Sequence, residues 1–280
     1  MIPAPFEYRR ASSAEEAVSL LTEHGDDAKL LAGGHSLLPL MKLRLAVPGV
    51  LIDIGRVGDL AYVSDDAGDT VRIGALTRHH DVANSDLLRE RVPLLAEVAG
   101  QIGDPQVRHR GTIGGSLAHG DPASDLPAAL LALRATLVAR GPNGEREISA
   151  DDFFTGFLET ALAPDELLTE IRVPATDGAG WAFEKFNRRA QDWAIVAVAA
   201  VLEPFGNGGS GPGVGLVNMG PVPLRAEGVE DALRQGAGAE EAASRADEDT
   251  EPPDDLNASP EYRRHLARVL TRRALAAAGA

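Results

Sequence analysis

The chain contains no cysteine, and this absence removes several kinds of chemistry at once. Without thiolates the chain can form no disulfide, no cysteine-based metal site and no cysteine-ligated iron–sulfur cluster. The lack of cysteine also fits a reducing compartment.

Long apolar runs and positive charge are scarce as well. The strongly apolar region Trp193–Leu202 runs for ten residues without a charge, and a membrane-spanning helix needs about 20. The opening residues MIPAPFEYRR lack the basic and then apolar order of a signal peptide, so we expect a cytoplasmic protein without membrane insertion. The net charge of −15 argues against a nucleic-acid partner.

Nearly half of that charge comes from one segment. Residues 240–255 hold eight acidic residues against one arginine. The segment is polar and contains prolines, so we predict an acidic, solvated linker over residues 240–258. The closing helix carries Arg264, Arg268 and Arg272 at a spacing of four, a stripe that is either solvated or able to dock an acidic partner.

At 280 residues the chain is long enough for about two domains. Short apolar strands and capped helices alternate up to residue 174, with a helix break near Pro93, and Pro174–Gly180 is the expected boundary. We divide the first part, 1–175, into α/β subdomains at 1–57 and 58–175. Three strands joined by short turns and a final helix predict a small antiparallel sheet with helices over 176–280.

Two glycine loops of one form stand out, AGGHS at Ala32–Ser36 and TIGGS at Thr112–Ser116. Glycine lets backbone N–H groups converge on an anion, and a neighbouring hydroxyl or imidazole adds a donor. Either loop alone is typical of a plain turn. The first follows a strand and the second precedes a capped helix, so together they favour a shared ligand such as a pyrophosphate.

A third glycine segment, GNGGSG at Gly206–Gly211, matches the spacing of a dinucleotide fingerprint. That fingerprint requires a helix directly after it. A strand follows here, which favours a hairpin loop.

The two loops, together with DPASDLPA, FEKFNRRAQDWAIVAVA and SPEYRRHLARVLTRRAL, resemble the flavin-binding medium subunits of molybdenum hydroxylases. The segments are similar to those of carbon monoxide dehydrogenase medium chains and of the FAD domain of xanthine dehydrogenase. The resemblance implies an α+β fold: a two-part FAD-binding domain of the vanillyl-alcohol-oxidase/PCMH type, then a small C-terminal domain with an antiparallel sheet and helices.

The same resemblance implies FAD as cofactor and a set of binding residues. On one side of the FAD pyrophosphate they are Ala32, Gly33, Gly34, His35 and Ser36. On the other side they are Thr112, Ile113, Gly114, Gly115 and Ser116, the last in place of an asparagine in several relatives. Asp125 would accept hydrogen bonds from FAD hydroxyls, and Leu168, Lys185 and Trp193 would lie near the ring system.

Several of these residues also have ordinary structural interpretations. Asp125 is equally a helix N-cap candidate, Lys185 on an alternating strand could face solvent, and Trp193 on an apolar strand could be core packing. His79, His80, His109 and His119 with Asp121 invite a metal site. No helical spacing supports one, so we expect no metal.

The implied function is that of an electron-transfer subunit. Electrons would pass from a partner's [2Fe–2S] clusters through FAD to an external acceptor, with substrate oxidised on a molybdopterin large subunit. The complex would be a dimer of heterotrimers, and this chain would contribute no catalytic residue of its own. A stand-alone FAD oxidase of the same fold and a non-catalytic scaffold are the alternatives.

Overall fold

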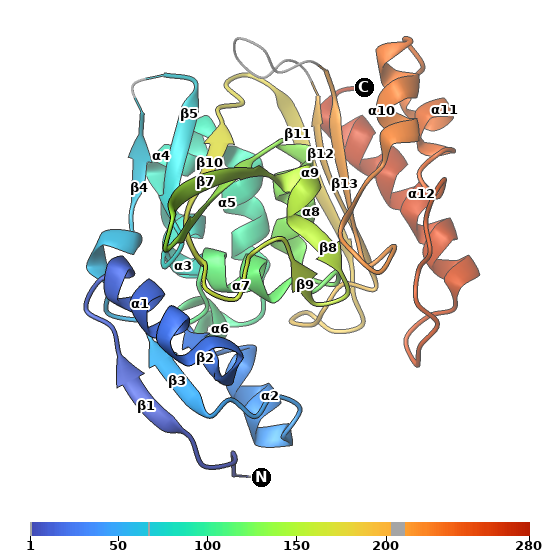
Figure 1. The fold of residues 1–280 in the computed structure, drawn as a ribbon. Coiled ribbons are helices and arrows are strands. Elements are labelled where there is room, and N and C mark those ends of the chain that lie inside the picture. Colours follow the sequence, from blue (N-terminus) through green and yellow to red (C-terminus); the bar gives the residue numbers. More distant parts are fainter. Residues whose placement is uncertain (1, 67, 203–210) are drawn as a thin grey trace.

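Three β-sheets and one short hairpin organise the computed structural model, which describes residues 2–66, 68–202 and 211–280 (Figure 1). The first sheet is small and fully parallel. Its strands in spatial order are β1 (Glu7–Arg10), β3 (Val50–Asp53) and β2 (Ala28–Leu31). It is followed along the chain by a larger antiparallel sheet and then by a third sheet that carries the C-terminal helices.

Helix α1 (Ala14–His24) covers the first sheet because its apolar residues recur at helical spacing. The side chain of Ser13 caps its N-terminus by accepting from the backbone N–H of Glu16, and Gly25 ends it at a φ of +53°. Short elements complete this lobe. They are η1 (Gly25–Asp27), α2 (Leu37–Leu43) and η2 (Gly58–Leu60).

The central antiparallel sheet holds the largest core. Its strands in spatial order are β4 (Val63–Asp65), β5 (Thr70–Gly74), β10 (Leu167–Pro174), β6 (Thr136–Gly141) and β7 (Gly144–Ser149). Ile171 of β10 lies opposite Ile73 and Leu137 on its two neighbours, and all three are fully buried. A hairpin of β8 (Phe154–Gly156) and β9 (Glu159–Thr160) projects from this part.

Short helices accompany the central sheet. They are α3 (His79–Asn84), α4 (Asp86–Arg91), α5 (Pro93–Gly100), α6 (Pro105–Arg108), α7 (Ile113–His119), α8 (Asp125–Ala132) and α9 (Ala150–Phe153). Pro93 occupies the first turn of α5, where its missing N–H costs nothing, so the expected helix break is confirmed. Every residue of α8 is buried.

The expected antiparallel sheet after residue 176 is confirmed. Its order is β11 (Gly180–Phe186), β12 (Val196–Leu202), β13 (Gly213–Val217) and β14 (Leu224–Arg225). The C-terminal helices are α10 (Glu227–Arg234), α11 (Ala239–Ala243) and α12 (Pro260–Ala278). Of the GNGGSG segment, residues 206–210 lie outside the described residues; the strand that argues against a dinucleotide fingerprint is β13.

This third sheet is covered on both faces, by α12 on one side and by α8 on the other (Figure 1). Strand β13 approaches α8 so closely that a Cβ at Gly213 would lie 2.0 Å from Ala132 O, and one at Gly215 would lie 1.9 Å from Ala128 O. Only glycine fits these two positions. The C-terminal sheet therefore packs directly on the first part of the chain.

The prediction of a solvated acidic linker over residues 240–258 is wrong for the first part of that segment, whereas residues 253–257 are exposed and form no helix or strand. Within residues 240–258, Ala242, Ala243 and Ala246 are buried in the core beneath α12. Small alanines alternate with the acidic residues, so one side of the segment packs while the carboxylates stay at the surface.

Residues of this segment are also the partners of the basic stripe on α12. Arg268 pairs with Asp247, Arg272 lies 3.8 Å from Glu240, and Arg264 donates to Thr250 O. The acidic partner of the stripe is thus this chain's own segment. Separately, no helix in the described ranges combines the length and the apolar character that a membrane span requires.

Candidate cofactor site

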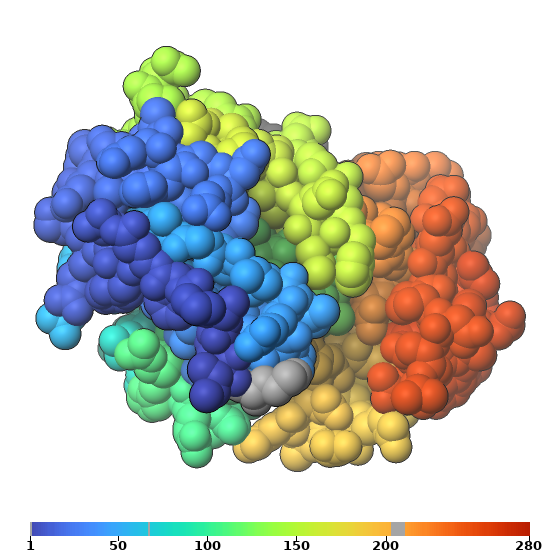
Figure 2. Space-filling model, turned by 60° about the horizontal axis from the view of Figure 1, so that its bottom comes forward, coloured from blue at the N-terminus to red at the C-terminus, as the bar shows by residue number. Residues whose placement is uncertain are grey.

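A cavity of about 550 Å³ opens where the N-terminal lobe, the central helices and β11 meet. Figure 2 shows the molecule turned so that its bottom comes forward, with the blue N-terminal part at the left and the gold segment between β11 and β12 at the lower right. Every residue predicted for the FAD site except Ile113 lines the cavity. The topology thus brings together residues that are as far apart in the sequence as Ala32 and Trp193.

The first glycine loop joins β2 to α2 and leaves its backbone donors free. Among the described residues, the N–H groups of Gly33, Gly34, His35 and Ser36 have no protein acceptor. Gly34 adopts a φ of +80°, a left-handed conformation that favours glycine. Consecutive free N–H groups ahead of a helix form an anion-binding concavity, which is the arrangement that a pyrophosphate requires.

The second loop does not repeat this arrangement. The N–H groups of Ile113 and Gly114 donate to Thr77 O and Ala75 O, at 2.9 and 2.8 Å. Those of Gly115 and Ser116 bond to Thr112, the N-cap of α7. The expectation of two equivalent backbone nests is therefore wrong, because the N–H groups of the second loop already donate to protein acceptors and connect α7 to the central sheet.

Glycines in both loops serve protein packing instead. A Cβ at Gly33 would lie 2.2 Å from Arg110 O, and a Cβ at Gly114 would lie 2.7 Å from Ala75 O. Ile113 is fully buried in the core and does not line the cavity. What the second loop offers a ligand is the hydroxyl of Ser116, which is hydrogen-bonded to Ser124 Oγ at 2.9 Å.

Asp125 and Lys185 form a buried ion pair at the cavity wall. Lys185 Nζ lies 2.6 Å from Asp125 Oδ2 and 3.4 Å from Gln101 O. The N-cap of α8 is Ser124, so the cap interpretation of Asp125 is wrong, and burial of Lys185 excludes a solvent-facing side chain. Burial raises the pKa of Asp125, and the neighbouring ammonium opposes that shift.

One oxygen of this pair is left unused. Asp125 Oδ1 is buried and has no hydrogen-bond partner within the part of the chain that the structure describes. A buried acceptor without a donor is costly. A ligand hydroxyl at this wall would satisfy it.

Leu168 and Trp193 supply apolar lining to the same cavity. Leu168 lies on β10 at a register irregularity of the sheet and is buried. Trp193 is 59% exposed on the loop between β11 and β12, so the core-packing interpretation is wrong. Its indole forms part of the cavity wall.

Sequence reasoning assigned His79 only to a metal hypothesis, whereas the structure places it in the cavity wall. Burial lowers its pKa to about 4, with smaller contributions from His35 and Arg108, so the ring is neutral at pH 7. His80 and His109 stack on each other with centroids 4.0 Å apart. In the described ranges no three His, Asp or Glu side chains are grouped to hold a metal ion. His79 begins α3 shortly after the end of β5, and this position at the end of a strand is the signal that could have indicated a cavity residue.

The wall therefore fits FAD. The free N–H groups of residues 33–36 suit a pyrophosphate, the unused Asp125 oxygen suits a sugar-alcohol hydroxyl, and Leu168 and Trp193 suit a flat ring. The cavity volume lies within the range of cofactor pockets, about 300–1,000 Å³.

Comparison with known proteins gives the same result. Residues 4–176 match the model of the FAD binding domain in molybdopterin dehydrogenase, and residues 181–278 match the CO dehydrogenase flavoprotein C-terminal domain. The carbon monoxide dehydrogenase medium chain of Hydrogenophaga pseudoflava is 47% identical over 100% of this chain and 99% of its own length. The glyceraldehyde dehydrogenase medium chain of Sulfolobus acidocaldarius is 39% identical, with 98% of each chain covered.

A solved structure of the Hydrogenophaga pseudoflava carbon monoxide dehydrogenase superposes with a TM-score of 0.94, at 47% identity, over 99% of this chain and 98% of that one. That enzyme lacks the Mo-pyranopterin moiety of the molybdenum cofactor. Two family models that together span nearly the whole chain, and relatives this similar across their full length, leave one conclusion. The chain belongs to the FAD-binding medium subunits of the molybdenum hydroxylases, an oxidoreductase family that includes carbon monoxide dehydrogenase.

Proposed function

We propose that this chain is the electron-exit module of a multi-subunit molybdenum hydroxylase. Electrons would reach its FAD from [2Fe–2S] clusters on a small partner subunit and leave to an external acceptor, while a molybdopterin large subunit oxidises the substrate. The complex would be a dimer of heterotrimers. The observation that carries the proposal is a cavity built for FAD in a chain with no thiolate to hold a cluster.

The chain's own residues would bind and orient the cofactor. The N–H groups of Gly33, Gly34, His35 and Ser36 would hold the pyrophosphate, and Asp125 Oδ1 would accept from a hydroxyl. Lys185 keeps that carboxylate in place through Oδ2. Leu168 and Trp193 would cover the ring and exclude water from part of it.

Neutral His79 would add a polar wall without adding charge. When bound, FAD supplies the capacity to accept electrons from one protein and pass them to another molecule. The medium chains of glyceraldehyde and carbon monoxide dehydrogenases are both close relatives, so the substrate on the large subunit is left open.

Anaerobic mixing tests this proposal against a stand-alone oxidase. The FAD-loaded chain alone should leave its visible flavin band unchanged with carbon monoxide, an aldehyde or an N-heterocycle. Addition of the cluster-bearing and molybdopterin-bearing subunits should let one of these substrates bleach the band. Rapid, saturable bleaching by the lone chain would identify a self-sufficient oxidase and overturn the proposal. A purified chain without flavin, and unable to take it up, would favour the scaffold.

A further inference from the structure

Helix α2 is apolar on nearly every side, although it lies at the surface. Leu37 and Leu40 line the cofactor cavity and Met41 is buried. Leu38 and Leu43 nevertheless face solvent, at 37% and 56% exposure. A helix that is hydrophobic all round is normally enclosed.

The apolar surface continues beyond the helix. Leu45 is 73% exposed and Val47 is 58% exposed. Together with Leu38 and Leu43 these residues form one stretch of sequence, which we call the α2 face, beside the cavity wall. Exposed apolar surface that is contiguous in this way marks interaction sites.

The segment that contains the α2 face is net positive in a chain that is net negative, although the carboxylate of Asp27, just before this segment, accepts from Gly49 N. Residues 28–57 contain Lys29, Lys42, Arg44 and Arg56 but only one carboxylate, that of Asp53, in a chain of net charge −15. Asp53 is already engaged, because its two oxygens accept from Tyr8 Oη and Gly55 N. No carboxylate among the described residues pairs with any of the four cations.

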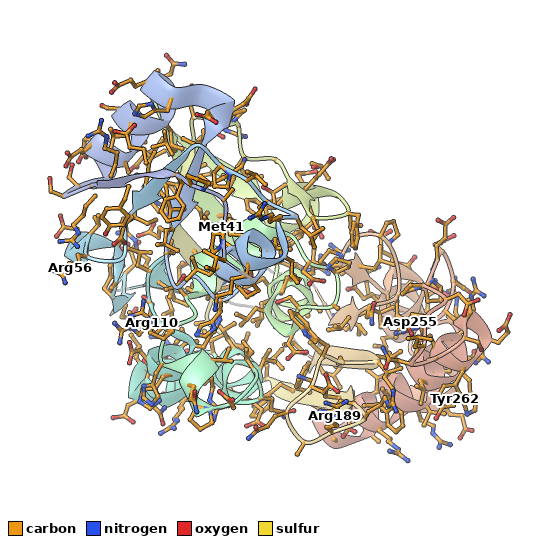
Figure 3. All side chains as sticks on the ribbon, turned by 90° about the horizontal axis from the view of Figure 1, so that it is seen from below. Met41, Arg56, Arg110, Arg189, Asp255 and Tyr262 are labelled. Atoms are coloured by element: carbon orange, nitrogen blue, oxygen red, sulfur yellow. The ribbon has the colours of Figure 1, made fainter. Side chains whose placement is uncertain are left out.

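A neighbouring segment extends this positive surface. A Cβ on Gly33 would lie 2.2 Å from Arg110 O, so the Arg110 backbone abuts the first glycine loop. Figure 3 shows Arg56, Arg110 and the helix that carries Met41 on the same lower face of the molecule. Arg110 has no ion pair within the described ranges either, and the acidic residues nearest to it in sequence are Asp104, which caps α6, and Asp121, which accepts from Ala123 N.

We propose that the α2 face is the docking surface for the cluster-bearing partner subunit, through an acidic, apolar-centred patch on that partner. The inference rests on the proposed function. Cationic residues around an apolar centre select an acidic surface by charge complementarity, and the apolar centre supplies the buried area that a stable contact requires. Residues of the same helix line the cofactor cavity, so a protein held here would lie close to the bound FAD.

Binding of the FAD-loaded chain to the separately purified iron–sulfur subunit of its complex, measured over a range of salt concentrations, tests the proposal. Lys42→Glu should weaken binding about tenfold at low salt, mostly through slower association, and the difference should shrink as salt screens the charges. Arg273→Glu is the matched control, because Arg273 is exposed on α12 and has no ion-pair partner among the described residues. It should bind like the unmodified chain.

A second variant tests the apolar centre independently of charge. Leu45→Ser/Val47→Ser should weaken binding about tenfold at every salt concentration, while Leu256→Ser, at a fully exposed leucine of the C-terminal part, should not. Flavin content and melting temperature should be unchanged in all four variants. If all four bind the partner equally well, the docking surface is elsewhere and only this inference fails. If the unmodified chain binds no iron–sulfur subunit, the proposed function fails with it.

Discussion

Lys185 Nζ lies 2.6 Å from Asp125 Oδ2, and this contact joins β11 to the first turn of α8 with each side chain only 6% exposed. An ion pair this deeply buried gains little over an apolar pair of the same shape. Each charge alone, however, is costly to bury. The pair therefore stabilises the contact between β11 and α8 mainly because separating them, or removing one partner, would leave a buried charge without its counter-ion.

The first prediction follows from that penalty. Asp125→Asn should lower the free energy of unfolding of the FAD-free chain by about 3–5 kcal/mol, because it leaves the Lys185 charge without a counter-ion. The double variant Asp125→Asn/Lys185→Met should lose less than the sum of the two single variants. Urea unfolding measures this. Glu248→Gln, in the exposed pair with Arg245, is the control and should cost less than about 1 kcal/mol. Strictly additive losses would contradict a coupled pair.

The second prediction concerns the buried histidine. The pKa of His79 is lowered from 6.5 to about 4, so the unfolded chain takes up a proton at a higher pH than the folded chain does. Above pH 6.5 the ring is neutral in both states and does not lower the free energy of unfolding. Between pH 6.5 and 4 only the unfolded chain binds the proton, so the free energy of unfolding falls by about 3 kcal/mol over this range. His79→Asn should flatten that part of the pH–stability profile. His109→Gln, at an exposed ring, should leave it in place, and identical profiles for all three proteins would refute the assignment.

The third prediction separates the two glycine loops. Gly34→Ala places a side chain at a φ of +80° and against the flexible end of Leu38, at a cost of about 1–2 kcal/mol. The chain should fold and bind FAD less tightly. Gly114→Ala should damage the fold itself, because its Cβ would lie 2.7 Å from the backbone oxygen of Ala75. Circular dichroism melting and flavin content report both effects. A Gly114→Ala protein as stable as the unmodified chain would show that the model of the second loop is wrong.

The fourth prediction concerns Glu230, which is fully buried between three arginines. Its Oε1 also accepts from Val214 N of β13. Glu230→Gln should cost about 3–5 kcal/mol in urea unfolding, since it removes the buried carboxylate that the three partly exposed guanidinium groups share. Asp231→Asn, one residue further along and half exposed, should cost less than about 1 kcal/mol. Equal losses for the two variants would count against the network.

The fifth prediction concerns cofactor choice. Chain refolded or expressed with flavin should hold about one FAD and should bind FMN much more weakly, because the free N–H groups of residues 33–36 are arranged for a pyrophosphate. Isothermal titration with each flavin measures the ratio. Equal affinity for FMN would mean that these donors do not hold the phosphates.

Local signals in the sequence were sufficient for the positions of several elements. Ser13 before an apolar periodic run, Gly25 after it and Pro93 at a helix start each act within a few residues, and each is found where it was expected. The loop at residues 32–36 was recognisable for the same reason. Its glycines and its place after β2 are properties of a short stretch of chain.

Contacts between distant segments could not be predicted in the same way. The N–H groups of Ile113 and Gly114 look free in the sequence, and only the approach of residues 75–77 shows that they are used. The acidic segment looks solvated until α12 is seen to cover its alanines. Long-range packing decided both outcomes, and neither composition nor periodicity contains it.

The approach of β13 to α8 bears on how genes for such subunits can be recombined. Exchange of residues 181–278 for the same part of a relative would import a new strand beside an old helix. The chimera would fold only if its residues 213 and 215 were glycines. The carbonyl groups of residues 128 and 132 would also have to approach them as closely as they do here. A crossover near residue 176 would also separate Lys185 from the aspartate that neutralises it. Chimeric flavin subunits joined at that border should therefore fail to fold more often than exchanges of the entire chain. The segment that can be exchanged as a unit is then the whole chain, not either of the two parts that the family models match.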